Sequence, residues 1–240
     1  MKFAAKFALV LVILMSVGTL SAKPIGQMYM EGGIFMHIIS LLLLVMIAMA
    51  IVKTLQLSVR EKIDSQEFYL KLKGYIRNDQ VDEAIKISEQ FKKTTIGFIF
   101  WSGLLGYRDG RRASSDKRAI ERSVQNAFDE SGLQTIPKIE SGLFWFDIIA
   151  QVATLVGLLG TIFGLVAAFD ALANAPEADK SRLLTEGISM AMGTTAYGLI
   201  VAIPTMFVKG ALQARADRII NDIDEYSVKI INQISYSMKG

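Results

Sequence analysis

The chain of 240 residues contains no cysteine and a single histidine. The absence of cysteine excludes disulfides, a thiol nucleophile and cysteine-based zinc or iron–sulfur sites. One histidine excludes any site that needs two imidazole ligands. The excess of positive over negative charge is also small, because 26 basic and 23 acidic residues leave a net charge of +3. This net charge is too low to indicate nucleic-acid binding. With no nucleophile–base pair and no phosphate loop either, we expect no enzymatic activity, metal or cofactor.

Long uncharged stretches dominate what is present. Hydrophobic residues make up 52% of the chain and the mean hydropathy is +0.38, which is high for a soluble domain of this length. Three stretches, 34–52, 148–169 and 187–208, lack Asp, Glu, Lys and Arg altogether. About 20 apolar residues in a helix cross the ~30 Å hydrocarbon core of a bilayer. The pattern predicts an all-α integral membrane protein with three transmembrane spans.

A further apolar run at 7–20 has a different character, because Lys2 and Lys6 precede it and Ser21 and Ala22 follow it. A basic start, an apolar centre and a small-residue end are typical of a secretory signal peptide. We therefore expect residues 1–22 to be a signal peptide, with an uncleaved anchor helix as the alternative.

The charges between the spans predict their orientation, because basic excess marks the cytoplasmic side. Residues 53–140 carry 16 basic and 13 acidic residues, the tail from Lys209 carries 5 and 4, and the connection 170–186 carries 2 and 4. The expected order is a periplasmic N-terminus (23–33), span one (34–52), a cytoplasmic helical domain (53–142), span two (143–169), a periplasmic loop (170–186), span three (187–208) and a cytoplasmic helical tail (209–240).

Two features of the cytoplasmic parts lead to specific expectations. Glycines at 106 and 110 predict a break after the apolar segment 96–105. In the tail, residues at alternating steps of three and four form a seam that we expect to face neighbouring subunits. The seam comprises Ala216, Ile219, Ile220, Ile223, Ser227, Ile230, Ile234 and Ser237.

Hydroxyl and small side chains take the place of charges within the spans. In span two, Gln151, Thr154 and Thr161 share one helix face, and Thr195 and Thr205 share a face of span three, with Thr194 beside it. We interpret these six side chains as the wetted lining of a pore. The alternative is that each threonine bonds a carbonyl of its own helix. The small residues that we expect at helix–helix contacts are Gly157, Gly160, Gly164 and Gly198.

The same residues resemble a known family. GLLGTIFG at 157–164 resembles the GLLGTVxG signature of the MotA/TolQ/ExbB proton-channel family, and GISMAMGTTAYGLIVAIP at 187–204 resembles its signature GIxxALxxTAxGLxVAIP. Glu31, Gly32 and Gly33, ahead of the first span, also resemble ExbB-like members. Thr161 and Thr195 match the family's pore threonines. One departure is Met190, which stands where ExbB- and TolQ-like members usually have a glutamate, one turn after Glu186.

The resemblance implies an ExbB-like subunit of the bacterial inner membrane, five copies of which surround a dimer of a single-span partner of the ExbD/TolR type. The partner would carry the aspartate that takes the proton, and the complex would couple proton-motive force to work through a TonB-like or TolA-like protein. The sequence is compatible with H⁺ or Na⁺ as the ion. The alternatives are a TolQ-like subunit, a MotA-like motility stator, or a membrane scaffold that conducts no ion.

Overall fold

In a computed structural model, which describes residues 29, 33–61, 63–173 and 175–238, every regular element is a helix. This confirms the all-α prediction. The expected signal peptide, 1–22, lies outside the described residues, as does most of the expected periplasmic N-terminus. The described chain divides into two compact units. One comprises the described residues up to Ile51 together with Gly142–Ala211, and the other comprises Val52–Ser141 and the residues from Leu212.

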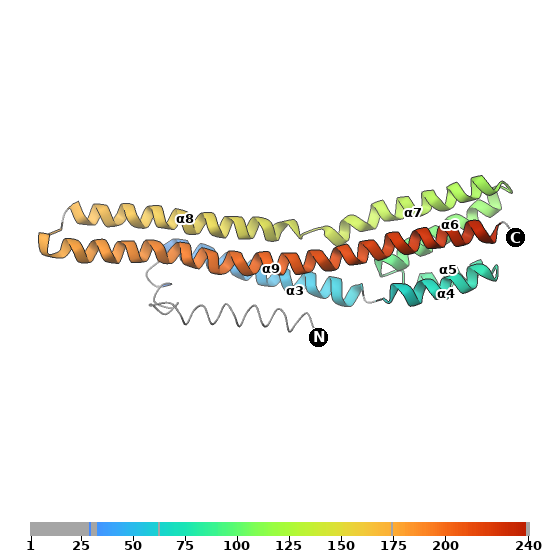
Figure 1. The fold of residues 1–240 in the computed structure, drawn as a ribbon, viewed down its shortest axis with the longest axis horizontal. Coiled ribbons are helices and arrows are strands. Elements are labelled where there is room, and N and C mark those ends of the chain that lie inside the picture. Colours follow the sequence, from blue (N-terminus) through green and yellow to red (C-terminus); the bar gives the residue numbers. More distant parts are fainter. Residues whose placement is uncertain (1–28, 30–32, 62, 174, 239–240) are drawn as a thin grey trace. The chain divides into compact units, whose positions relative to one another are not determined.

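Three long apolar helices supply the first unit. They are α3 (Gly33–Leu55), α8 (Phe144–Ala173) and α9 (Glu177–Ser237), and α3 and α9 both continue into the second unit. Each is long and apolar enough to cross a membrane, and each of the three expected spans lies almost wholly within one of them. In Figure 1, α8 and α9 lie side by side and run in opposite directions.

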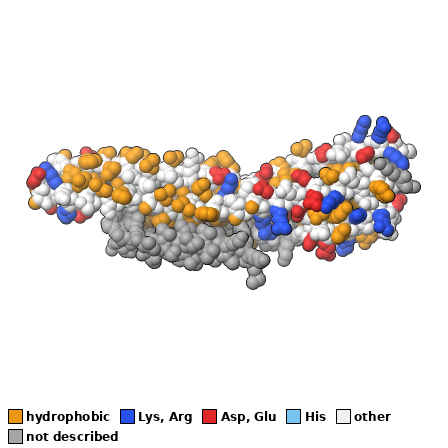
Figure 2. Space-filling view, viewed as in Figure 1, with side chains coloured by type: hydrophobic (Ala, Val, Ile, Leu, Met, Phe, Trp, Pro, Cys, Tyr) orange, Lys and Arg blue, Asp and Glu red, His pale blue; other side chains and the backbone are white. Residues whose placement is uncertain are grey.

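The three helices of this unit pack around a small apolar core. Ile39 of α3, Ala153 of α8 and Val201 of α9 are fully buried together. The rings of Phe35 and Phe163 stack at 5.6 Å between their centres, so α3 also touches α8. Many other large apolar side chains of the three helices are exposed, and Figure 2 shows hydrophobic side chains over much of the visible surface of α8 and α9. An apolar exterior of this kind is suited to lipid.

The connection between α8 and α9 differs from the expected loop at 170–186. Helix α8 runs to Ala173 and α9 begins at Glu177, so helix covers nearly all of this range. The charged residues that suggested a loop are compatible with helix because they pair along it, as Lys180 does with Glu177 at 2.8 Å. Both helices therefore extend past the uncharged stretches by one to three turns.

The second unit is built from shorter helices with well-formed ends. They are α4 (Ser65–Arg77), α5 (Val81–Gln90), α6 (Thr95–Ala113) and α7 (Lys117–Glu140), preceded by a π-helical segment, η1 (Gln56–Arg60). The Asp64 carboxylate accepts hydrogen bonds from the first backbone N–H groups of α4, and the Thr94 hydroxyl does the same for α6. These are the residue types that best cap a helix start.

The break that we expected at 106–110 was wrong, because α6 continues to Ala113. These glycines instead let α6 approach α7 closely. A Cβ at Gly106 would lie 2.5 Å from the Cβ of Ala127, and one at Gly103 would lie 2.1 Å from the Phe128 ring. Packing between the two helices thus outweighs the roughly 1 kcal/mol by which glycine disfavours a helix.

The expectation that the tail seam faces neighbouring subunits was also wrong. Ile223 and Ile230 are 2% and 0% exposed within the single chain. The tail of α9 packs on its own unit, where the Arg215 Nε donates to the Leu57 carbonyl at 3.1 Å and the Tyr69 and Tyr226 rings lie 5.3 Å apart. The periodicity correctly indicated a covered face, but the cover is provided by helices of the same chain.

Candidate functional site in the contact between α8 and α9

The contact between α8 and α9 is formed by residues with almost no side chain. A Cβ on Gly198 would lie 2.6 Å from the Ala153 carbonyl oxygen, and one on Gly157 would lie 3.0 Å from the Thr194 carbonyl oxygen. A Cβ on Gly160 would lie 2.8 Å from the Thr194 hydroxyl, and one on Gly164 would lie 3.1 Å from the Ala191 Cβ. The four glycines that the sequence singled out for helix packing therefore all lie where the two backbones approach each other.

This close approach brings threonine hydroxyls from both helices to one backbone carbonyl. The Gly157 carbonyl oxygen lies 3.2 Å from the Thr161 hydroxyl, 3.0 Å from the Thr195 hydroxyl and 3.3 Å from the Thr194 hydroxyl. The Thr161 and Thr195 hydroxyls also hydrogen-bond directly to each other. Residues 34 positions apart in sequence thus meet at a single point of the helix contact.

The protons of this cluster have more than one possible arrangement. Each hydroxyl has one hydrogen to donate and two lone pairs that accept. Thr195 can donate to Gly157, while Thr161 can donate to Gly157, to Thr195 or, at 3.4 Å, to the Ala191 carbonyl. Because both threonines are only partly buried, their remaining lone pairs can meet a group that approaches from outside the chain.

The other polar side chains of the expected lining occupy different surroundings. Thr154 donates to Ala150 at 3.0 Å, and Thr205 donates to Val201 at 2.7 Å. These are bonds within their own helices. Thr194 and Thr205 are buried inside the chain, whereas Gln151 is exposed. Thr161 and Thr195 are therefore the pair that combines contact across the helices with partial exposure.

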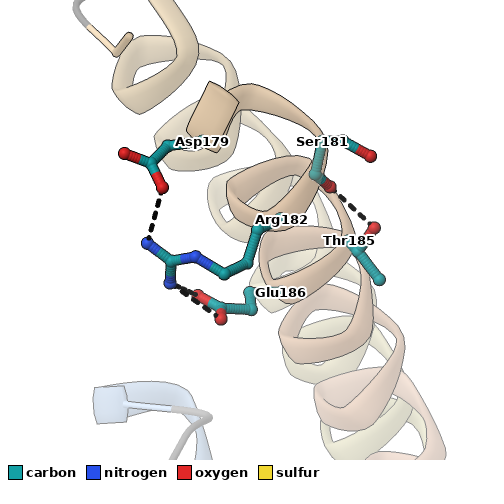
Figure 3. Close-up of polar contacts among 5 residues, drawn as sticks. All are labelled: Asp179, Ser181, Arg182, Thr185 and Glu186. Carbon is teal, nitrogen blue, oxygen red and sulfur yellow. Dashed lines mark hydrogen bonds and ion pairs between the residues drawn. The ribbon is translucent and has the colours of Figure 1, made fainter. Parts of the chain in front are cut away.

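Charged groups lie at both ends of the α8–α9 pair. At one end the Lys209 Nζ lies 3.3 Å from the Asp147 carboxylate. At the other end Arg182 donates to Glu186 at 3.1 Å and to Asp179 at 3.5 Å, as Figure 3 shows. The hydrogen bond to Glu186, followed by the charge of Glu186 and the contact with Asp179, raises the pKa of Arg182. Between these two charged ends, residues 187–208 of α9 contain no carboxylate.

Met190 stands at the position where ExbB-like and TolQ-like sequences usually have a glutamate. Met190 is 38% exposed on α9, so an apolar side chain reaches the surface there. Glu186, one turn earlier, is exposed and paired with Arg182. Its carboxylate is held at the charged end of the helix rather than carried into the uncharged stretch.

Sequence reasoning missed one polar contact of the first unit. The Ser40 hydroxyl on α3 and the Tyr197 hydroxyl on α9 form a hydrogen bond of 2.9 Å. A serine inside an uncharged stretch was the available signal, since a buried hydroxyl needs a partner. The single histidine, His37, is exposed on α3, with its Nδ1 3.0 Å from the Gly33 carbonyl oxygen and its ring centre 5.2 Å from that of Tyr29.

The described residues contain three membrane-capable helices, and the uncharged stretches of two of them meet at a cluster of hydroxyls. These features define a polytopic membrane protein. The model of the MotA/TolQ/ExbB proton channel family matches residues 92–225, more than half of the chain. The chain therefore belongs to the MotA/TolQ/ExbB proton channel family. This family is defined by transport rather than by an enzymatic reaction, and the chain is a multi-pass protein of the inner membrane.

Individual relatives agree with this assignment. The chain is 33% identical to the biopolymer transport protein exbB1 of Vibrio cholerae over 40% of this chain and 41% of that one. It is 29% identical to the Tol-Pal system protein TolQ of Haemophilus influenzae over 56% of this chain and 61% of that one. An ExbB homologue of Methanothermobacter thermautotrophicus is 24% identical over 82% of this chain and 66% of that one. The chain thus spans about half the length of the first two relatives.

Proposed function

We propose that this chain is the ExbB-like channel subunit of a complex that couples proton-motive force to work at the cell envelope. The observation that carries the proposal is the contact between the Thr161 and Thr195 hydroxyls across α8 and α9. It lies in two stretches of 22 residues that contain no charge, at side chains that remain partly exposed. A hydroxyl pair in such a place is suited to line a narrow, wetted path.

The proposal assigns the titrating group to a partner, because the uncharged stretches 34–52, 148–169 and 187–208 contain no carboxylate. An ExbD/TolR-type partner with one span would bring an aspartate next to the threonines. A charge crossing the field releases about 2.3 kcal/mol per 100 mV, but an unpaired charge in low dielectric costs several kcal/mol. A hydroxyl donates to the carboxylate and accepts from the acid, so the threonine pair can stabilise both states.

The proposed assembly follows the family. A homopentamer of this chain would surround a dimer of the partner, with 53–142 and the tail from 209 in the cytoplasm and 170–186 in the periplasm. The complex would transmit the energy of the proton gradient to a TonB-like or TolA-like protein. The names of the relatives support both an ExbB-like and a TolQ-like role.

A motility stator is the second candidate, and one observation favours it. MotA-like stators also lack the glutamate that Met190 replaces, and Glu186 is held by Arg182 instead of substituting for it. In this case the driven machine would be a motor rather than a transporter. Deleting this chain from its own cells and measuring both motility and envelope transport separates the two roles. Loss of motility alone would indicate a stator, and loss of transport alone would indicate an ExbB-like or TolQ-like subunit.

The direct test of channel function uses the complex purified through a tag on this chain and reconstituted into liposomes with a pH-sensitive dye inside. We expect an imposed potential to drive proton uptake, and uptake to stop when the intramembrane aspartate of the co-purified single-span protein is replaced by asparagine. A complex without such a partner, or with uptake no faster than in empty liposomes, would favour the scaffold alternative.

A further inference from the structure

A cavity of about 180 Å³ in the second unit has no role in the proposed channel. It lies between η1, the start of α6 and the last turns of α7. Its wall contains three lysines and one carboxylate, so its net charge is +2. The charged residues are Lys92, Lys93, Lys138 and Glu61.

The carboxylate of this cavity is already engaged within the chain. One oxygen of Glu61 accepts from the Thr95 backbone N–H at 2.9 Å, and the other accepts from the Thr95 hydroxyl at 2.9 Å. Lys92 lies over the Trp101 ring, with its Nζ 3.5 Å from the ring centre. Among the residues that the structure describes, none forms an ion pair or hydrogen bond with the Lys93 or Lys138 ammonium group or with the Gln56 amide. These groups can therefore contact a ligand, and the two positive charges favour an anion.

The position of the cavity along the chain places it close to the membrane surface. Gln56 follows the uncharged stretch 34–52 by four residues, which is about 6 Å along a helix. Lys138 precedes the stretch 148–169 by ten residues. The Phe98 and Trp101 rings lie 6.0 Å apart beside the lysines, and aromatic side chains of this kind gather where lipid headgroups meet water.

We propose that this cavity binds the phosphate of an anionic phospholipid headgroup. A lysine ammonium group binds phosphate as a compact point charge, and basic pockets at span ends are typical sites for such headgroups. Free phosphate shares this chemistry. The membrane-proximal position favours the lipid, since a lipid is already concentrated there. The proposal is independent of the threonine pair and of ion conduction.

The test uses the full-length protein, delipidated in detergent and analysed by native mass spectrometry after titration with phosphatidylglycerol or phosphatidylcholine. We expect a preference for phosphatidylglycerol that the Lys93→Gln, Lys138→Gln variant loses. Each lysine near a membrane surface is worth roughly fivefold in affinity, so the pair should cost about 25-fold. The Lys93→Arg, Lys138→Arg variant keeps both charges and should retain the preference.

A matched control removes two exposed lysines of the same unit that lie outside the cavity, Lys71 and Lys117. The Lys71→Gln, Lys117→Gln variant should bind phosphatidylglycerol as the unmodified protein does. An equal loss in both variants would reduce the effect to overall charge and overturn the site. Equal retention of the two lipids, or inorganic phosphate at low millimolar concentration displacing the lipid completely, would also overturn the proposal.

Discussion

The Thr195 hydroxyl of α9 lies 3.0 Å from the carbonyl oxygen of Gly157 on α8. This distance is possible because Gly157 and Gly198 have no side chains to separate the helices, since a Cβ on Gly157 would lie 3.3 Å from the Gly198 Cα. The hydroxyl pair and the glycine contact are therefore parts of one arrangement. A change that separates the helices should also disturb the threonines.

Gly198→Ala should destabilise the first unit, because its Cβ would lie 2.6 Å from a backbone oxygen that cannot rotate away. Overpacking of this kind costs about 1–3 kcal/mol. Gly210→Ala in the same helix is the control, since nothing lies within 4 Å of its Cβ. Thermal unfolding in detergent should show a lower midpoint for Gly198→Ala alone, and equal midpoints would refute the close contact.

The Ser40–Tyr197 hydrogen bond should stabilise the packing of α3 against α9. Ser40→Ala, Tyr197→Phe and the double variant form a thermodynamic cycle, and we expect a coupling of about 0.5–1.5 kcal/mol. The measurement is the free energy of unfolding in detergent. Strict additivity of the two single changes would show that the bond contributes nothing.

In the tail, Ile230→Ala should destabilise the chain itself, because Ile230 is fully buried in its own unit. A cavity of this kind costs about 2–5 kcal/mol. Val228→Ala, at an exposed position two residues away, should change stability by less than about 0.5 kcal/mol. Thermal unfolding followed by circular dichroism distinguishes them. Unchanged unfolding of Ile230→Ala would contradict the burial of this side chain in its own unit.

The sequence pattern predicted the helices and their covered faces, but not which helices contact each other. The charge-free stretches predicted the three long helices, because a charged side chain inside lipid is costly and a membrane-spanning helix therefore needs about 20 residues without charge. The helical period also placed Thr161 on its polar face and indicated that Ile230 is covered. It could not say which helix provides the cover, because a period reports a face and not its partner. Likewise, glycine propensity at Gly106 predicted a break, whereas contact with α7 decides the outcome.

Membrane orientation can be tested with single cysteines, because the chain has none of its own. Ser115 and Ser181 are both exposed. From the charge of the connections we expect Ser181→Cys to react with an impermeant maleimide added to intact spheroplasts, and Ser115→Cys to react only after lysis. The reverse result would invert the proposed topology.

The measurement that tests the central claim most directly is proton flux through the reconstituted complex when Thr161 and Thr195 are both changed. Valine keeps the shape of threonine and removes the hydroxyl, whereas serine keeps the hydroxyl. Thr205→Val is the matched control, since Thr205 is buried and its hydroxyl bonds its own helix. At equal protein and partner levels, we expect the double valine variant to lose at least about 90% of the flux, an effect of about 1.4 kcal/mol on the rate. The double serine and Thr205→Val variants should retain most of it. Unaltered flux in the double valine variant would contradict the account.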